Sequence, residues 1–191
     1  MYKFFFKDIF DFYLAIILFL FFFSLMALIY LTLFALIGSP IFTQKRPGYL
    51  NKPFTIFKFK TLLDKDCKNF KKNKEMFKFG IFLRKTGIDE IPQLLNILKG
   101  DMSFIGPRPL LYEYLKKYSN QEKKRHLVKP GITGLAQVNP EPTGNKIWKK
   151  SIKLDLYYVK EINFILDLQI FLKNIGIIFL KKKQYKDFKK F

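Results

Sequence analysis

The stretch FYLAIILFLFFFSLMALIYLTLFALI, residues 12–37, decides the fold because it contains no charged residue. As a single helix it would be about 39 Å long, which exceeds the hydrocarbon core of a bilayer at about 30 Å. Asp8 and Asp11 stand where the start of a signal peptide would be positive, and no small-residue cleavage site follows. We therefore expect residues 1–40 to form a membrane-embedded N-terminal helix.

The charges around this helix place the rest of the chain, residues 41–191, in the cytoplasm, because almost all Lys and Arg residues follow Gln44. Physics alone leaves open whether the helix crosses the bilayer or enters and returns. No Pro or Gly interrupts residues 12–37, which favours a tilted spanning helix. Ser24 lies near the midpoint, where its hydroxyl can bond back to a carbonyl and bend a helix without breaking it.

The composition points to anionic partners. Lys and Arg number 35 against 15 Asp and Glu, which gives a formal charge of +20. The basic residues are scattered along the chain and not gathered in one recognisable module, so we expect no nucleic-acid partner. The single cysteine, Cys67, excludes an internal disulfide and a cysteine-cluster metal site. The single histidine, His126, ends a basic run and is expected at the surface.

Beyond residue 40 the sequence predicts an α+β fold that is mainly helical. Two strand-like segments joined by turn residues predict a small β-hairpin over residues 41–44 and 54–60. Helices are expected over residues 75–84, 91–98, 110–118 and 145–160, and loops over residues 64–74, 130–134 and 139–144. Residues 164–180 allow two interpretations: an amphipathic helix lying in the membrane interface, with the lysines that follow at anionic head groups, or a helix packed on the core.

The candidate site lies in RKTGIDEIPQLLNILKGDMSFIGPRP, residues 84–109. Asp89 and Glu90 stand at a predicted helix start, where acidic residues are ordinarily caps. Arg84 and Arg108 frame the pair, which favours phosphate chemistry over capping because an anionic carboxylate near an anionic phosphoryl group needs cations to offset the repulsion. Mg²⁺ suits one or two carboxylates together with substrate phosphates, and an aspartate can act as the nucleophile. No Walker A loop or protein-kinase motif is present.

Several longer blocks carry a resemblance to a known family. DEIPQL (residues 89–94), KGDMSFIGPRP (99–109) and PGITGLAQV (130–138) are similar to the small monotopic phosphoglycosyl transferases of bacteria, the bacterial sugar transferase family. QKRPG (44–48), KFKT (58–61) and LDLYYV (154–159) fit the same pattern. The resemblance implies transfer of a sugar-1-phosphate from a UDP-sugar to undecaprenyl phosphate, with release of UMP. The transferred sugar would be an N-acetylated amino sugar. It also implies a re-entrant helix bent at Ser24 at the cytoplasmic face of the bacterial inner membrane.

The resemblance also implies roles for single residues. Asp89 would be the nucleophile of a ping-pong reaction through a phospho-sugar-aspartyl intermediate, and Glu90 would position the metal or activate the polyprenyl phosphate. Asp89 and Glu90 would bind Mg²⁺. The residues expected to face phosphate groups are Lys60, Arg84 and Arg108. The chain departs from the family in lacking a proline after Ser24 and in its loop over residues 139–145, which leaves the sugar undetermined.

A second interpretation is a non-enzymatic membrane-surface protein whose basic body binds anionic lipid or a glycan-assembly partner. It explains the charge and the apolar leader, but not the carboxylate pair near Arg108. The partners that the enzyme would have are a UDP-sugar, undecaprenyl phosphate, inner-membrane lipid and downstream glycosyltransferases.

Overall fold

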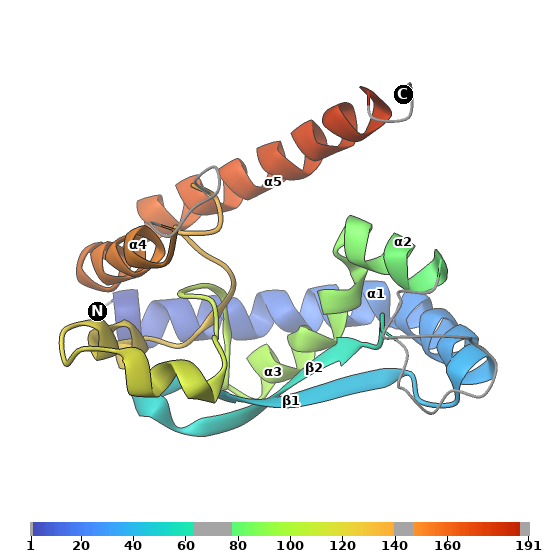
Figure 1. Ribbon diagram of the computed structural model, residues 1–191, viewed down its shortest axis with the longest axis horizontal. Helices are drawn as coiled ribbons and strands as arrows, with labels where there is room; N and C mark the ends of the chain where they lie inside the picture. Colours follow the sequence, from blue (N-terminus) through green and yellow to red (C-terminus); the bar gives the residue numbers. More distant parts are fainter. Residues whose placement is uncertain (1, 63–77, 140–146, 188–191) are drawn as a thin grey trace.

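The long apolar segment forms one continuous helix, α1 (Lys7–Ile37), after a π-helical turn, η1 (Tyr2–Phe6). The computed structural model describes residues 2–62, 78–139 and 147–187 (Figure 1). The helix ends at Gly38, which adopts φ 71° and donates its N–H to the carbonyl of Phe34 at 2.9 Å. The stretch Phe6–Ile37 is long and apolar enough to cross a membrane. The ribbon of α1 changes direction toward its C-terminal end (Figure 1).

The predicted hairpin is confirmed. Strands β1 (Ile41–Pro47) and β2 (Pro53–Phe59) pair antiparallel, with Ile41 opposite Phe59 and Pro47 opposite Pro53. A 3-10 turn, η2 (Tyr49–Asn51), joins them. The hairpin forms the long lower edge of the molecule in Figure 1 and lies beside α3.

The remaining helices are mostly short. They are α2 (Lys78–Thr86), η3 (Ile88–Gln93), α3 (Leu94–Leu98), η4 (Tyr112–Lys117), η5 (Glu122–Leu127), α4 (Ile147–Glu161) and α5 (Phe164–Asp187); η3, η4 and η5 are 3-10 helices. The helix predicted over residues 91–98 is therefore divided, because a 3-10 segment containing Pro92 precedes the α-helical turns. The prediction of a helix over residues 110–118 was wrong about the type of helix, since residues 112–117 form the 3-10 helix η4.

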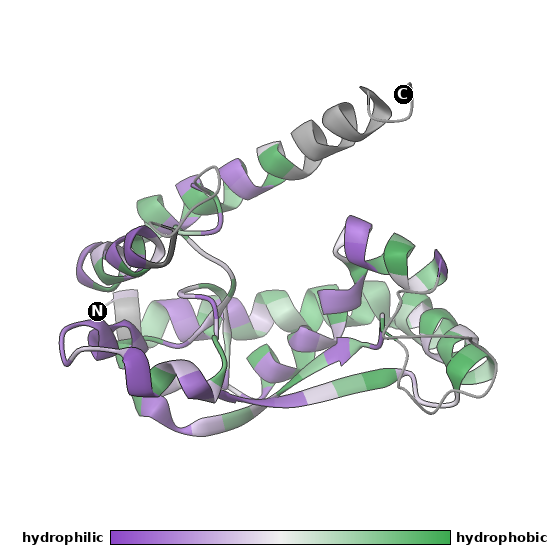
Figure 2. Cartoon of the chain, in the orientation of Figure 1, coloured by the Kyte–Doolittle hydropathy of each residue, from purple (hydrophilic) through white to green (hydrophobic). Residues whose placement is uncertain are grey.

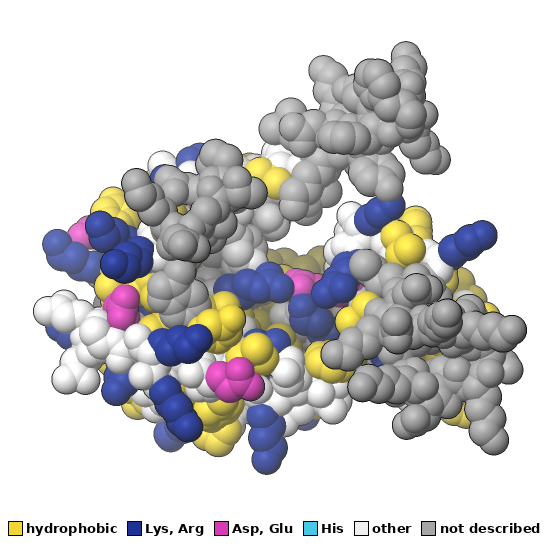
Figure 3. All heavy atoms as spheres, viewed as in Figure 1, with side chains coloured by type: hydrophobic (Ala, Val, Ile, Leu, Met, Phe, Trp, Pro, Cys, Tyr) yellow, Lys and Arg dark blue, Asp and Glu magenta, His cyan; other side chains and the backbone are white. Residues whose placement is uncertain are grey.

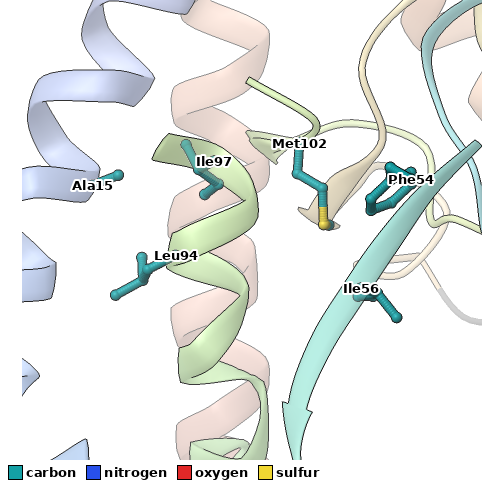
Figure 4. Close-up of a cluster of buried hydrophobic side chains, with 6 residues drawn as sticks. All are labelled: Ala15, Phe54, Ile56, Leu94, Ile97 and Met102. Atoms are coloured by element: carbon teal, nitrogen blue, oxygen red, sulfur yellow. The ribbon is translucent and has the colours of Figure 1, made fainter. Parts of the chain in front are cut away.

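Two hydrophobic clusters join α1 to the rest of the protein. In the first, Ala15 of α1 packs with α3 and β2 (Figure 4); its buried members are Ala15, Phe54, Ile56, Leu94, Ile97 and Met102. In the second, Ile29 and Leu33 of α1 pack with Phe59 and Leu83. One face of α1 thus contributes to the core near both of its ends, while most of its other apolar side chains are exposed. Figure 2 shows how strongly hydrophobic residues predominate along this helix.

The loop predicted at residues 130–134 is wrong in part, because β4 (Gly131–Thr133) lies there. It pairs parallel with β3 (Ser103–Ile105). The backbones approach so closely that a Cβ on Gly131 would lie 2.1 Å from the nitrogen of Gly106. These glycines permit strand pairing between two segments that are remote in the sequence.

His126 does not lie at the surface, where we expected it. His126 is 6% exposed and Arg125 is 2% exposed. Burial, followed by the charge of Arg125, lowers the pKa of His126 to about 4, so that the imidazole is neutral near pH 7. Arg125 and His126 point inward, whereas Lys123 and Lys124 are exposed. The reason is that η5 begins with reciprocal hydrogen bonds between Ser119 and Glu122 and then packs against α4.

Helix α5 has one packed face and one exposed face. Ile170 and Asp167 are buried, and Asp167 Oδ2 accepts hydrogen bonds from Lys7 Nζ at 2.6 Å and the Tyr2 hydroxyl at 2.7 Å. Among the α5 side chains that the structure describes, the exposed large apolar ones are Phe164, Ile165, Leu168, Phe171 and Leu172. Packing on the core, one of the two interpretations that the sequence allowed, is therefore confirmed for one face of α5.

Candidate functional site

The predicted carboxylate pair lies in the 3-10 helix η3, directly after the left-handed turn at Gly87, which adopts φ 75°. This turn brings the N–H of Glu90 to the carbonyl of Gly87 at 3.1 Å. Asp89 is 7% exposed, whereas the Glu90 side chain is 23% exposed. The first carboxylate of the pair is therefore buried against the protein, and the second faces a cationic environment.

Cations from separate elements meet at this pair. Lys58 of β2 donates a hydrogen bond from Nζ to Glu90 Oε1, and Arg108 Nη2 lies 3.6 Å from the same oxygen. Arg84 stands in the last turn of α2, from which its charge acts on Asp89. Figure 3 shows Lys and Arg side chains gathered around a small acidic area near the middle of the visible face. The arrangement suits an anionic ligand, because positive charge remains beside the carboxylates.

The pKa of Asp89 is raised above its usual range. The largest cause is burial, and the neighbouring negative charge of Glu90 raises the pKa further. The positive charges of Lys58 and Arg84 act in the opposite direction. Asp89 is thus an incompletely compensated buried carboxyl group, a condition that is common at functional sites.

The structure brings together Arg84, Asp89, Glu90 and Arg108. Lys60 follows the end of β2, where its Nζ donates to Ser39 Oγ at 2.8 Å. Ser24 lies exposed within the continuous helix α1. Most of the predicted loop over residues 139–145 lies outside the described residues, as does Cys67.

Sequence reasoning missed Lys58 as the β2 residue that contacts the pair. Lys58 and Lys60 are two positions apart, so strand alternation places both on one face of the hairpin and does not distinguish them. A second missed residue is Asn96, which is fully buried. Its Oδ1 accepts from the N–H of Phe57 at 3.1 Å, and its Nδ2 donates to the carbonyl of Thr55 at 2.7 Å. Asn96 thereby fixes α3 against β2 and holds Lys58 near Glu90.

The chemistry of the pair fits a magnesium ion. Two adjacent carboxylates offer the oxygen ligands that Mg²⁺ prefers, and a cation would relieve the repulsion that raises the pKa of Asp89. Among the described residues, no group of three or more His, Cys, Asp or Glu side chains could hold a metal ion. Any Mg²⁺ at Asp89 and Glu90 would therefore need further oxygen ligands from substrate or water.

The structure combines a carboxylate pair whose first member is buried, three cations around that pair, and a helix long enough to cross a membrane. This combination is the one expected of a membrane-associated protein that binds an anion. The chain matches the bacterial sugar transferase family over residues 2–181. It belongs to that family, as the motifs at residues 89–94, 99–109 and 130–138 predict.

Curated relatives agree with this assignment. The uncharacterized sugar transferase EpsL of Bacillus subtilis (strain 168) is 50% identical over 139 residues, which are 70% of this chain and 67% of that protein. The UDP-glucose:undecaprenyl-phosphate glucose-1-phosphate transferase of Klebsiella pneumoniae is 38% identical over 78% of this chain and 34% of its own length. The enzyme of the same name from Escherichia coli (strain K12) is 35% identical over the same shares. The chain thus spans about a third of these last two relatives.

Proposed function

We propose that this protein is a phosphoglycosyl transferase that moves a sugar-1-phosphate from a UDP-sugar to undecaprenyl phosphate and releases UMP. The observation that carries the proposal is the burial of Asp89 beside Glu90, with Lys58, Arg84 and Arg108 around the pair. Both proposed substrates are phosphates, and the site offers a carboxylate together with cations that offset its charge. Family membership and the names of the Klebsiella pneumoniae and Escherichia coli relatives support the reaction class.

In the first step, an oxygen of Asp89 forms a bond to the sugar-linked phosphorus of the UDP-sugar. The bond between that phosphorus and the bridging oxygen breaks, and its electron pair leaves with UMP. The sugar phosphate is then held on Asp89 as an acyl phosphate. Arg84, Lys58 and Arg108 stabilise the negative charge on the phosphoryl oxygens during this exchange.

In the second step, a phosphate oxygen of undecaprenyl phosphate attacks the same phosphorus. The bond to Asp89 breaks, its electron pair returns to the carboxylate, and a polyprenyl-diphosphate sugar leaves. Glu90 holds Lys58 and Arg108 near the reacting phosphate in both steps, because it contacts both side chains. Ser39 precedes β1 and Lys60 follows β2, so both lie at the open end of the hairpin. There Lys60 would meet the phosphate of the lipid substrate.

Asp89 and Glu90 would hold Mg²⁺ together with substrate phosphates. The ion would neutralise phosphate charge and so reduce the repulsion that the attacking carboxylate meets. In the structure Lys58 and Arg108 both contact Glu90 Oε1, so the carboxylate pair would hold the ion beside these cationic side chains.

The proposed location is the cytoplasmic face of the bacterial inner membrane, with α1 entering the bilayer and returning near Ser24. The two ends of α1 support this topology, since Ala15 packs on α3 and β2 while Leu33 packs beside Leu83. A helix that contacts the same body near both ends does not project away from it as a spanning helix would. The exposed apolar face of α5 would lie in the interface.

We assign an N-acetylated amino sugar to the donor on family resemblance, and glucose is the competing sugar because it stands in the names of relatives. The test is UMP release from a panel of UDP-sugars with undecaprenyl phosphate and Mg²⁺. Asp89→Asn should abolish release and leave membrane association intact. Glu113→Gln, which neutralises an exposed carboxylate on η4, is the matched control and should retain activity. Full turnover by Asp89→Asn would reject Asp89 as the nucleophile.

A non-enzymatic membrane-surface protein remains the alternative. Such a protein would bind anionic vesicles through its positive charge and would release no UMP with any UDP-sugar. The burial of Asp89 argues against it, because binding to an anionic surface gains nothing from a buried carboxylate.

A further inference from the structure

Arg125 lies buried behind the loop that carries Arg108. Its side chain is 2% exposed, and its Nε and Nη2 donate to Asp155 Oδ2 of α4 at 3.0 and 2.7 Å. Nη1 donates to the Tyr118 hydroxyl at 2.9 Å, and Nη2 also donates to the backbone carbonyl of Arg108 at 2.8 Å. One guanidinium therefore connects α4, the segment after η4 and the Arg108 loop.

Stability alone does not account for this arrangement. A buried ion pair gains little net stability, because removing both charges from water costs about as much as their attraction returns. Burial dominates the pKa of Asp155 and raises it above the usual range even with Arg125 beside it. What the pair provides, and apolar residues of the same size would not, is a directed donor to the Arg108 carbonyl.

The same loop is held from its other side by the small parallel sheet. The N–H of Gly131 donates to the carbonyl of Pro107 at 3.1 Å, and the N–H of Gly106 donates to the carbonyl of Thr133 at 2.9 Å. The Arg108 side chain, in contrast, is 50% exposed, and its guanidinium lies 3.6 Å from Glu90. The backbone of Arg108 is thus fixed while its side chain stays accessible to a ligand.

We propose that Arg125 is a positioning residue that places the Arg108 guanidinium at the carboxylate pair and at the phosphate it binds. The inference rests on the proposed function, in which Arg108 contacts substrate phosphate. Arg125 itself lies out of contact with substrate and acts through the Arg108 backbone. Lysine cannot replace it, because an ammonium group lacks the planar fork that reaches Asp155 and the Arg108 carbonyl together.

The test is a double-mutant cycle with Arg125→Lys and Arg108→Gln on the full-length protein in lipid nanodiscs. Arg125→Lys should lower kcat/KM for UMP release about tenfold or more in the wild-type background, and by less than about twofold when Arg108 is already Gln. Tyr118→Phe is the matched control. It removes another hydrogen bond from the same guanidinium but leaves the Arg108 carbonyl bonded, so it should change kcat/KM less than about twofold. Equal losses from Arg125→Lys in both backgrounds would overturn the proposal.

Hydrogen exchange provides a readout that needs no activity. In Arg125→Lys, peptides covering residues 104–111 and 129–134 should exchange faster than in the wild type, and in Tyr118→Phe they should not. Unchanged exchange in Arg125→Lys would reject the positioning role. A wild-type protein that releases no UMP from any UDP-sugar would instead reject the proposed function, and the exchange experiment would still decide whether Arg125 orders this loop.

Discussion

Lys58 donates a hydrogen bond from β2 to Glu90 in η3, across 32 positions of sequence. This ion pair stands beside Asp89, and the charge of Lys58 lowers the pKa of Asp89 against the larger effect of burial. The pKa of Asp89, the nucleophile that we propose, therefore depends on a charge that the hairpin supplies through Lys58.

Replacing Lys58 should shift the pH dependence of UMP release. Lys58→Met removes a positive charge near Asp89, so the pKa of Asp89 rises further and the carboxylate is protonated at a higher pH. The acidic limb of the kcat/KM profile should move to higher pH. Lys58→Arg keeps the charge and should leave the limb near its wild-type position. A limb that moves equally in both variants would contradict this account.

Asp89→Asn should not destabilise the protein. The folded-state pKa of Asp89 is raised above its unfolded value, so ionisation of this group opposes folding. The destabilisation is absent below the unfolded pKa of about 3.9 and fully present above the folded pKa. The Tm of Asp89→Asn at pH 7 should accordingly equal or exceed that of the wild type, and any gain should disappear as the pH falls toward about 4. A clearly lower Tm at pH 7 would count against the raised pKa.

Asn96→Leu should destabilise the fold because it leaves two backbone groups of β2 without their partners. The N–H of Phe57 and the carbonyl of Thr55 lose the bonds that Asn96 provides. Each group left unpaired and buried costs about 1–3 kcal/mol. Chemical denaturation in detergent measures the loss, with the exposed Asn120 changed to Leu as the control. Equal stabilities for the two variants would show that the Asn96 bonds contribute nothing.

Gly131→Ala and Gly176→Ala should change stability in opposite directions. A Cβ at Gly131 would lie 2.1 Å from the backbone nitrogen of Gly106, so the strands must separate. We expect a loss of about 3 kcal/mol or more. A Cβ at Gly176, in α5, meets nothing within 4 Å, and alanine there should gain about 0.5–1 kcal/mol. Thermal unfolding of both variants measures the contrast.

Cysteine labelling in intact cells tests the membrane topology. In a Cys67→Ser background, Phe5→Cys places an exposed thiol before α1, and Lys52→Cys places one on the hairpin turn. A re-entrant helix leaves both thiols inside the cell, so a membrane-impermeant maleimide should label neither until the cells are permeabilised. Labelling of Phe5→Cys alone in intact cells would mean that α1 crosses the membrane.

Local patterns predicted the hairpin and α1 because alternation and unbroken hydropathy are properties of neighbouring residues. They also predicted the pairing of Asp89 and Glu90 with cations, since Arg84 and Arg108 frame the pair in sequence. They could not predict β4, whose pairing with β3 depends on the approach of two remote glycine-containing segments. Burial of Arg125 was equally hidden, because its partner Asp155 is 30 positions away and the basic run around it resembles a solvated surface.

The ion pair between Lys7 and Asp167 has a consequence for biogenesis. Its two residues are 160 positions apart, and both are buried. During synthesis Lys7 emerges from the ribosome long before Asp167 exists, and domains generally fold from the N-terminal end as the chain grows. Lys7 therefore stays hydrated, or paired with Asp11 one helical turn away, until the start of α5 is made. Docking of α5 onto the start of α1 therefore comes late in synthesis, and in a chain that ends before Asp167 the charge of Lys7 lacks this partner.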